Sequence, residues 1–280
     1  MSARVTVVVA TRDRREQVLA TLAQLRAHSP ASPVVLVDDA GSDGTPEAVC
    51  AAFPEVEVLR APRNLGAGAR TLGVRAARTP YVAFADDDSW WAPGALDRAA
   101  AHFDASPRLA VLAGRVLVGD EERLDPVCDL MAASPLPRRD DLPGPSVLGF
   151  LACGAVVRRR AFLDVGGFEP VIHFLGEEEL LARDLAALGW GLAYVDGVVA
   201  HHHPARGGAR PGRARLQRRN ALLSAWMSRP AGVVVRETLR TARDDRGALL
   251  DAARRLGPAV AGRRPVPAWV ERDLRLLEAA

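Results

Sequence analysis

The sequence predicts an α/β fold in which a mostly parallel, Rossmann-like sheet is flanked by helices and followed by a helical extension. Short apolar runs alternate with helix-like segments through the first half of the chain, which is typical of a parallel sheet covered on both faces. From Pro204 onward the composition changes to an arginine- and glycine-rich linker and then to helical patterns alone. We therefore expect one α/β domain over residues 1–204 and an arginine-rich linker with a helical C-terminal extension over residues 205–280.

The first half of the chain contains four strand patterns separated by helix patterns. The strands are predicted over Val5–Ala10, Val34–Val37, Val56–Leu59 and Tyr81–Ala85. The helices between them are predicted over Arg15–Arg26, from the cap Thr45 with Pro46 at the first helical position, and over Ala69–Ala77. Because ligands of parallel sheets bind at the carboxyl ends of the strands, the residues that follow each strand are the first candidates for a site.

The second half of the domain is less regular. Asp125–Pro145 is rich in proline and polar residues and is predicted to be a surface excursion. Further strands are predicted over Leu109–Val118, Ala152–Val157, Leu192–Val195 and Val198–Ala200, with a helix over Glu177–Leu188. The extension is predicted to form helices over about Leu216–Ser228, Gly232–Leu256 and Pro267–Glu278.

Composition narrows the class of protein. The 280 residues carry a net charge of +3, and every basic residue is arginine. Since the lack of lysine and the abundance of alanine indicate a genomic bias, we expect no nucleic-acid partner. Three cysteines without a C-x-x-C spacing predict neither a disulfide framework nor a zinc site and favour the cytoplasm. No apolar run reaches the length of about 18 residues that a membrane span needs, although the arginines after Pro204 leave peripheral contact with the inner membrane face open.

A run of three carboxylates, Asp86, Asp87 and Asp88, directly follows the fourth predicted strand. Adjacent carboxylates repel one another and are costly unless water or a cation neutralises them. Their hard oxygen atoms suit Mg²⁺ or Mn²⁺ bound together with phosphate oxygens. The cluster therefore predicts a metal site, with a solvated acidic helix start as the alternative.

Three histidines, His201, His202 and His203, follow the last predicted strand. Because side chains alternate across a strand, His202 is expected to point away from its two neighbours. An imidazole beside carboxylates would shift the metal preference from Mg²⁺ towards Mn²⁺. The alternative is a set of solvated histidines, or a buried histidine bonded to a backbone carbonyl.

Three glutamates, Glu177, Glu178 and Glu179, begin the predicted helix that follows the turn Gly166-Gly167-Phe168. Carboxylates in a first turn are favoured by the helix dipole, so they need no further function. One of them could instead act as a general base, a role that requires a carboxylate within hydrogen-bond reach of an acceptor proton.

Two further segments could hold a phosphorylated ligand. The loop from Asn64 to Arg70 contains Gly66 and Gly68 and opens a helix, so it could offer backbone N–H groups and the Arg70 guanidinium to a diphosphate. Asp38 and Asp39 end the second strand and could accept hydrogen bonds from a base or ribose, although Asp and Gly would form a turn there in any case.

Taken in order, these segments resemble the family 2 glycosyltransferases, which have the GT-A fold. The resemblance covers about residues 4–203, and its specificity comes from the order and spacing of its segments rather than from any one of them. The segments are Val5–Arg14, Val34–Thr45, Asn64–Gly73, Tyr81–Pro93, Gly154–Phe168, Gly176–Trp190 and His201–His203. It implies a GT-A-type sheet and an inverting transfer of a sugar from a nucleotide-diphosphate sugar to an acceptor hydroxyl whose identity the sequence does not name.

The resemblance also implies roles for single residues in the metal site and in catalysis. Asp86 and Asp88 match the family's D-x-D pair, which binds the metal and the diphosphate, and Asp87 between them is expected near the ribose. Glu178 matches the second residue of the family's Glu-Asp pair, the general base. The family often has a metal-binding histidine further along the chain, and the spacing from Glu178 selects His202. The implied cofactor is Mn²⁺ or Mg²⁺.

On the donor side, the resemblance places Ala10, Arg12 and Asp39 at the nucleoside. Two departures from the family's pattern bear on these roles. Glu178 stands where aspartate is usual, which extends the reach of the base by one methylene, and Glu179 adds a third carboxylate that allows the assignment to shift by one residue. Arg12 stands where an aromatic side chain often packs on the base, so the nucleotide is not identified.

Two alternatives come from other classes of protein. The replacement of aspartate by Glu178 suggests a nucleotide-sugar-binding module that has lost catalysis. A nucleotidyltransferase that makes the sugar nucleotide would share a related sheet. Such enzymes usually carry a glycine- and lysine/arginine-rich signature after the first strand, which Thr11-Arg12-Asp13-Arg14 is not. We rank this alternative last.

Overall fold

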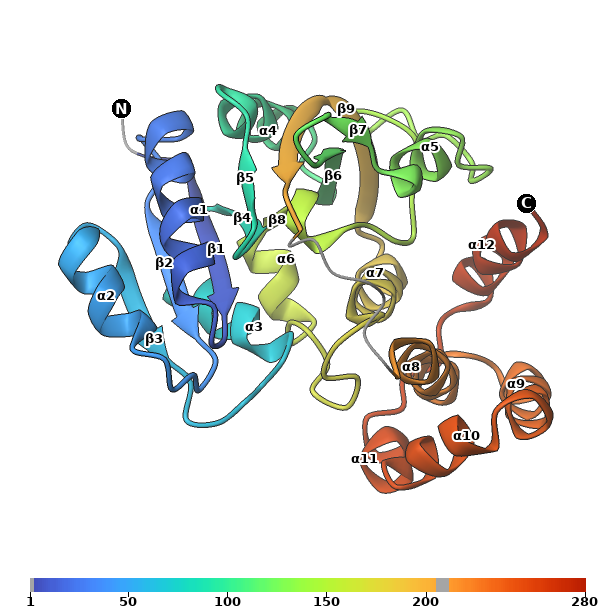
Figure 1. The fold of residues 1–280 in the computed structure, drawn as a ribbon. Helices are drawn as coiled ribbons and strands as arrows, with labels where there is room; N and C mark the ends of the chain where they lie inside the picture. Colours follow the sequence, from blue (N-terminus) through green and yellow to red (C-terminus); the bar gives the residue numbers. More distant parts are fainter. Residues whose placement is uncertain (1–2, 205–211) are drawn as a thin grey trace.

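A computed structural model describes residues 3–204 and 212–280, and these residues build a twisted sheet with helices on both faces (Figure 1). The strands are β1 (Val5–Thr11), β2 (Val34–Asp38), β3 (Glu57–Arg60), β4 (Tyr81–Asp86), β5 (Ser89–Trp91), β6 (Leu109–Val118), β7 (Arg123–Leu124), β8 (Ala155–Arg158) and β9 (Gly191–His202). Their order in the sheet is β3-β2-β1-β4-β8-β6-β9-β5, and β7 pairs with the outer part of β6. The pairs β1/β2, β1/β4, β2/β3 and β6/β9 are parallel, as the alternation of strand and helix patterns predicts.

Two helical layers cover the sheet. The helices of the α/β domain are α1 (Arg15–His28), α2 (Thr45–Ala52), α3 (Gly68–Ala76), α4 (Ala95–Ala105), α5 (Pro126–Ala132), α6 (Arg159–Asp164) and α7 (Glu177–Ala187). Alternate side chains of β1 enter different cores, since Val7 and Val9 pack with α1 and α4, whereas Val8 packs with α3 and α7. This burial on both faces explains why the strand is almost continuously apolar.

The strand register brings the predicted acidic residues to one edge of the sheet. Ala10 of β1 pairs with Asp86 of β4, and Thr11 of β1 pairs with Asp38 of β2. The carboxyl ends of three neighbouring strands therefore meet there, as expected for a ligand-binding edge.

Three strand predictions need correction. Ala152–Gly154 forms a short 3₁₀ turn rather than the start of a strand, and β8 begins at Ala155. The two strands predicted over Leu192–Val195 and Val198–Ala200 are one long strand, β9, with a shift in its register to β6 after Val195. Because β9 continues to His202, two of the three histidines lie within the strand instead of after it.

Helix boundaries also differ from those predicted. Thr45 is the first residue of α2 and not its cap, because Gly44 takes the cap position in a left-handed conformation (φ 76°) and the Asp43 carboxylate accepts bonds from the Thr45 backbone and hydroxyl. The stretch predicted to be a surface excursion contains helix α5, whose cap is the Asp125 side chain and whose buried face includes Cys128 and Met131. A capping aspartate followed by proline is a helix-start signal that the proline content obscured.

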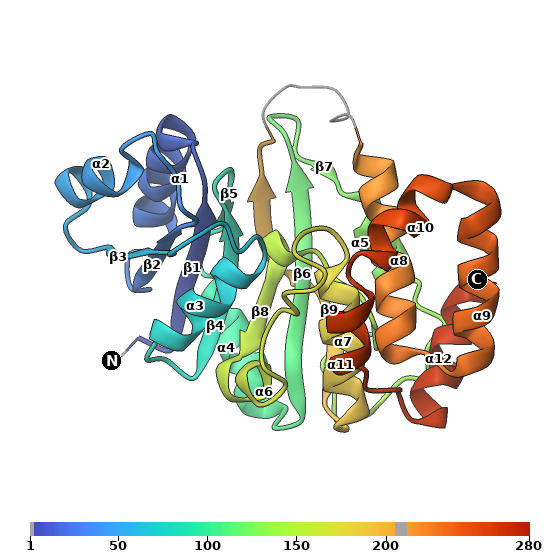
Figure 2. The ribbon, with the colours of Figure 1, turned by 90° about the horizontal axis from the view of Figure 1, so that it is seen from below.

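The extension is helical, as predicted, and packs beside α7 (Figure 2). Its helices are α8 (Arg213–Ser228), α9 (Ala231–Asp244), α10 (Arg246–Ala253), α11 (Leu256–Ala261) and α12 (Ala268–Ala279). The single helix predicted over Gly232–Leu256 is broken at Asp245, whose side chain caps α10. The predicted linker and domain boundary fall at residues 205–211, outside the described residues.

Two small apolar clusters join the extension to the domain. Leu180 of α7 packs with Leu222 and Leu223 of α8, and Ala186 of α7 packs with Val270 and other residues around α12. None of the described helices has the length and apolar character that a bilayer crossing needs.

Candidate active site

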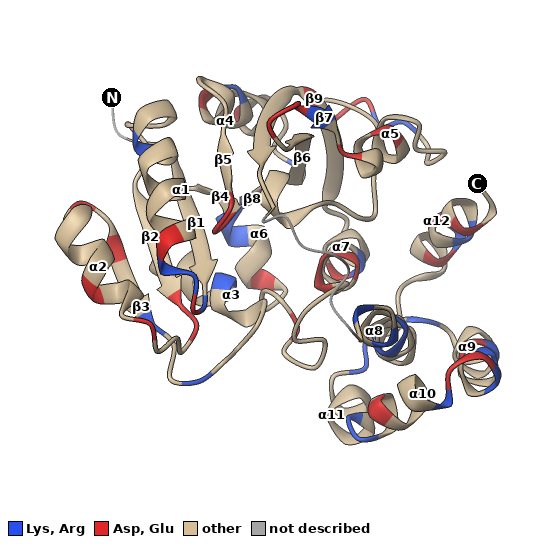
Figure 3. Ribbon diagram, viewed as in Figure 1, with Lys and Arg blue, Asp and Glu red and all other residues tan. Residues whose placement is uncertain are grey.

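A cleft of about 750 Å³ lies at the carboxyl edge of the sheet, between the α/β domain and the C-terminal helices. Asp86 from β4, Glu178 from α7 and His202 from β9 all line it. Figure 3 shows the acidic segments at the end of β4 and in the first turn of α7. Three elements that are distant in the sequence thus contribute polar side chains to one cavity, whose size is typical of a small-molecule site.

The first two aspartates of the predicted metal cluster are held by different partners. The Asp86 carboxylate pairs with the buried guanidinium of Arg70. Asp87 is buried, lies 2.7 Å from the Arg14 Nη1 atom, and accepts a bond of 2.9 Å from the Thr11 hydroxyl. Burial raises the pKa of Asp87 to about 6, and Arg14 and Thr11 act against that rise. Asp87 therefore anchors β4 to β1.

The third aspartate and the central histidine face each other. The Asp88 Oδ1 atom lies 3.3 Å from the His202 Nε2 atom, and Oδ2 accepts a bond of 3.2 Å from Arg14. Burial acts to raise the pKa of Asp88, but the His202 hydrogen bond and the Arg14 charge outweigh it and lower that pKa. Burial acts to lower the pKa of His202, and the Asp88 carboxylate outweighs it and raises that pKa.

The expected alternation of the histidines is confirmed. His201 and His203 both pack against the Trp90 ring, with ring centroids 5.6 and 4.6 Å apart, while His202 turns to Asp88. The pairing of β5 with β9 sets this geometry, because Ser89 lies opposite His202 in the ladder. Trp90 therefore fixes the orientation of the strand end that carries His202.

A buried cysteine joins the same cluster. The potential ligand atoms of Asp86, Cys153 and His202 all lie within 4.8 Å of one another. Burial raises the pKa of the Cys153 thiol, and the Asp86 carboxylate adds to that effect. Carboxylate oxygens with an imidazole and a sulfur nearby fit a divalent cation of the Mn²⁺ type better than Mg²⁺, which prefers oxygen ligands alone.

The three glutamates at the start of α7 have different environments. The helix begins after Gly176, which has a left-handed conformation (φ 91°). Glu177 is only 2% exposed, its Oε1 lies 3.8 Å from Arg70, and its Oε2 has no hydrogen-bond partner in the described part of the chain. Glu179 is exposed and pairs with Arg183 on the next turn.

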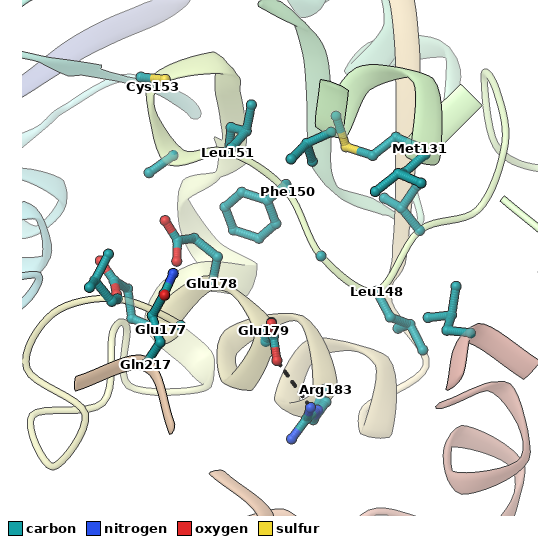
Figure 4. A pocket seen from close by; sticks show the side chains of 18 of the residues that line it. Met131, Leu148, Phe150, Leu151, Cys153, Glu177, Glu178, Glu179, Arg183 and Gln217 are labelled. Atoms are coloured by element: carbon teal, nitrogen blue, oxygen red, sulfur yellow. Dashed lines mark hydrogen bonds and ion pairs between the residues drawn. The ribbon is translucent and has the colours of Figure 1, made fainter. Parts of the chain in front are cut away.

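Glu178 is the glutamate whose pKa is raised most clearly, and it lies in the cleft. Its half-buried side chain points into the cleft beside Phe150 (Figure 4). Burial, together with the neighbouring Glu177 carboxylate, raises the pKa of Glu178 to about 8. A carboxyl with such a pKa in a cleft accepts and releases protons near neutral pH.

The residues predicted for the donor side lie at the same edge of the sheet, but most have internal partners. The Asp39 carboxylate accepts backbone bonds from Leu65 and Gly66, at 2.7 and 2.9 Å, and the Asn64 side chain accepts a third from Gly66. These two side chains therefore shape the glycine loop.

The other predicted donor-side residues, Ala10, Arg12 and Arg70, differ in their burial and in their partners. Ala10 is partly buried at the end of β1. The Arg12 side chain is about half exposed and lies 3.7 Å from Asp13. Arg70 is buried between the carboxylates of Asp86 and Glu177, so its charge compensates two acids of the site.

Sequence reasoning missed two residues that the structure brings into the site. Arg14 bridges Asp87 and Asp88, and its position at the end of the segment Thr11-Arg12-Asp13-Arg14 was the available signal. Cys153 had no such signal, because its place depends on the 3₁₀ turn before β8.

Comparisons with known proteins find a matching family and related sequences. The family model described as Glycosyl transferase family 2 matches residues 6–166. A pre-mycofactocin glycosyltransferase of Mycobacterium tuberculosis is 32% identical over 210 residues, which span 71% of this chain and 43% of the relative. An N-acetylglucosaminyl-diphospho-decaprenol L-rhamnosyltransferase of the same organism is 30% identical over 223 residues, 68% of this chain and 72% of the relative. The chain thus spans less than half the length of the first of these relatives.

Solved structures share the fold at lower identity. A mannosyltransferase from Pyrobaculum calidifontis in complex with GDP-Man and Mn²⁺ has a TM-score of 0.61 and 20% identity, covering 100% of this chain and 79% of that one. Residues 1–349 of S. aureus TarS in complex with UDP-GlcNAc have a TM-score of 0.60 and 15% identity, covering 90% of this chain and 72% of that one. These similarities confirm the GT-A-type α/β fold.

Proposed function

The chain belongs to glycosyl transferase family 2, and from this membership we propose that it transfers a sugar from a nucleotide-diphosphate sugar to an acceptor hydroxyl with inversion at the anomeric carbon. The observation that carries the proposal is the single cleft lined by Glu178, Asp86 and His202. A general base and a metal-binding edge that share one cavity meet the needs of this reaction. We assign the activity to the α/β domain of residues 1–204.

Glu178 is the proposed general base. Its carboxylate accepts the proton of the acceptor hydroxyl as the hydroxyl oxygen attacks the anomeric carbon and the bond to the nucleoside diphosphate breaks. One displacement occurs, so the configuration inverts. Glu177 keeps a carboxylate beside Glu178 and so raises its basicity, while Arg70 balances the charge of Glu177.

Asp86, Asp88 and His202 are the proposed ligands of Mn²⁺ or Mg²⁺, with the Cys153 sulfur close by. A bound ion supplies charge neutralisation for the departing diphosphate. The imidazole and the sulfur lead us to propose Mn²⁺ as the preferred ion. The Mn²⁺ in the complex of the P. calidifontis mannosyltransferase supports this choice.

The donor lies, in this proposal, along the carboxyl ends of β1, β2 and β4. Ala10, Arg12 and Asp39 contact the nucleoside, and Asp87 lies near the ribose. The loop that begins at Asn64 faces the diphosphate, and Arg70 compensates its charge through Asp86.

Nucleoside diphosphate release from UDP-, GDP- and dTDP-sugars, measured with Mn²⁺, Mg²⁺ or EDTA and without acceptor, tests the proposal. Slow metal-dependent hydrolysis of one donor is the expected result and would identify the donor. If no donor is hydrolysed and no nucleotide binds in a metal-dependent way, the proposal is wrong.

A binding module without catalysis is the second candidate, and the glutamate in place of the usual aspartate favours it. Tight metal-dependent binding of one nucleotide sugar, with neither hydrolysis nor transfer, would support it. The half-buried Glu178 inside the cleft favours the enzyme instead.

We propose that the extension is chiefly a cap on the domain. Arg215 and Arg218 pair with Asp251 and Asp245 of the same extension, and Arg219 donates to the backbone of Ile172 in the domain. The arginines at 206 and 210 lie outside the described residues.

Peripheral membrane contact is a second proposal for the extension, placing it at the inner membrane face of the cytoplasm. Exposed apolar side chains on its helices, such as Leu239 and Leu250, support it, and the free cysteines suit a reducing compartment. The protein should pellet with anionic vesicles at low salt and be released by high salt. Failure to pellet at low salt would exclude this contact.

A further inference from the structure

The cleft continues well beyond the groups assigned to catalysis, and its far part is apolar. Phe150 lies next to Glu178, and Met131 and Leu148 line the side away from Glu177 (Figure 4). Leu274 and Leu277 of α12 complete this wall from the C-terminal extension. If the hydroxyl of a ligand lies at Glu178, the remainder of the ligand therefore contacts aliphatic and aromatic side chains.

Several of these apolar side chains are open to solvent although they line a cavity. Leu130 of α5 is 72% exposed, Phe174 before α7 is 41% exposed, and Leu277 of α12 is 36% exposed. They come from three separate elements, which are α5, the loop before α7 and α12. Exposed apolar surface gathered at a concave site, continuous with catalytic groups, is typical of a ligand-binding surface.

Two arginines of this part, Arg183 and Arg229, are paired within the protein. Arg183 lies 3.3 Å from the Glu179 carboxylate. Arg229 pairs with Glu271 at 2.7 Å and with Glu278 at 2.6 Å. Since these two guanidinium groups have carboxylate partners, they compensate charge inside the wall and are not available to bind an anionic group of the ligand.

We propose that the acceptor is an amphipathic molecule whose hydroxyl-bearing head lies at Glu178 and whose uncharged aliphatic chain lies between α5 and α12. This assignment rests on the proposed glycosyl transfer, because the acceptor is identified by its hydroxyl beside the base. The extension then has a substrate-binding part, since α12 supplies one wall of the acceptor site.

Binding of alkyl β-D-glucosides below their micelle-forming concentrations tests the proposal. Isothermal titration compares methyl, hexyl, octyl and decyl glucoside in the presence of Mn²⁺ and the nucleoside diphosphate that binds. A fully buried methylene strengthens binding up to about fourfold, so a half-covered chain should make octyl glucoside bind on the order of 100-fold more tightly than methyl glucoside. Affinity that does not change with chain length would overturn the proposal.

Two neighbouring leucines on α12 provide a matched pair of variants. Leu277→Gln changes the cleft wall, whereas Leu276→Gln changes a side chain that is 40% exposed and does not line the cleft. Leu277→Gln should weaken octyl glucoside binding about three- to tenfold and leave methyl glucoside binding unchanged. Leu276→Gln should bind both glucosides with the affinity of the unaltered protein. If both variants weaken binding equally, or if neither does, the alkyl chain of the glucoside binds elsewhere.

Nucleotide binding in the same preparations separates the two proposals. If Mn²⁺-dependent nucleotide binding is present but chain length and Leu277→Gln have no effect, the acceptor class is wrong and the proposed transfer stands. If nucleotide binding is absent, the proposed transfer itself fails.

Discussion

Replacing Glu178 by glutamine should remove catalysis and stabilise the fold at alkaline pH. The side chain keeps its size, so only the ionisable group is lost. Burial and Glu177 raise the pKa of Glu178 from 4.5 to about 8, and a shift of that size sets a ceiling of about 5 kcal/mol on the cost of ionising it in the folded protein. The group is half-buried and interacts with the Glu177 carboxylate. We therefore expect Glu178→Gln to raise the free energy of unfolding by about 2 kcal/mol at alkaline pH.

The sign of the pH dependence follows from proton binding in the two states. Below about pH 4.5 the carboxyl is protonated in both the folded and the unfolded chain, and the substitution changes little. Between about pH 4.5 and pH 8 the folded protein holds a proton that the unfolded chain has released, so the stability of the unaltered protein falls as pH rises. Glu178→Gln removes this loss, and its advantage grows until about pH 8.

Urea denaturation at pH 5.5, 7 and 8.5 measures this difference, and donor turnover is followed on the same samples. Turnover should fall on the order of 10²–10⁴-fold. Glu16→Gln on α1 is the control, because this side chain is 84% exposed and does not line the cleft, so the substitution should change the free energy of unfolding by less than about 1 kcal/mol at every pH. Near-normal turnover of Glu178→Gln, or a stability difference that does not grow with pH, would refute the reasoning.

Three further predictions concern the same site. Transfer should rise about tenfold per pH unit up to a pKa near 8 and then level off, because only the ionised base accepts a proton; a flat profile of kcat/KM from pH 6 to 9 would contradict this. His202→Ala should weaken Mn²⁺-dependent binding of nucleoside diphosphate at least about tenfold in titration calorimetry, whereas His203→Ala, which removes contacts with Trp90 and Asp120, should bind normally. Arg70→Met should lower the free energy of unfolding by about 3–5 kcal/mol, because it leaves two acids of the site without their buried cation; an unchanged melting temperature would argue against that pairing.

Local patterns were sufficient to predict much of the sheet edge. The strand β4 and the carboxylates after it follow from one apolar run and the residues that end it, so Asp86–Asp88 could be placed before any contact was known. The direction of His202 followed from the alternation of side chains along a strand. Such inferences succeed because they depend only on neighbours within the same element.

Other parts of the site depend on contacts that no local pattern encodes. Cys153 reaches the cluster because the 3₁₀ turn before β8 carries it there, and Arg14 because a loop after β1 folds back over β4. The apolar wall from α12 needs the packing of the extension on α7. These features arise from pairings across tens to hundreds of residues, where periodicity gives no guidance.

The pairing of β5 with β9 has a consequence for how the protein matures during synthesis. The antiparallel ladder that places Asp88 beside His202 can close only after the chain has been made through residue 202. Contacts of such long sequence separation form late, because loop closure must precede them. A nascent chain that ends at residue 166, where the family match ends, would have the family signature but neither Glu178 nor His202. Acquisition of the proposed metal affinity would therefore report completion of the sheet during translation.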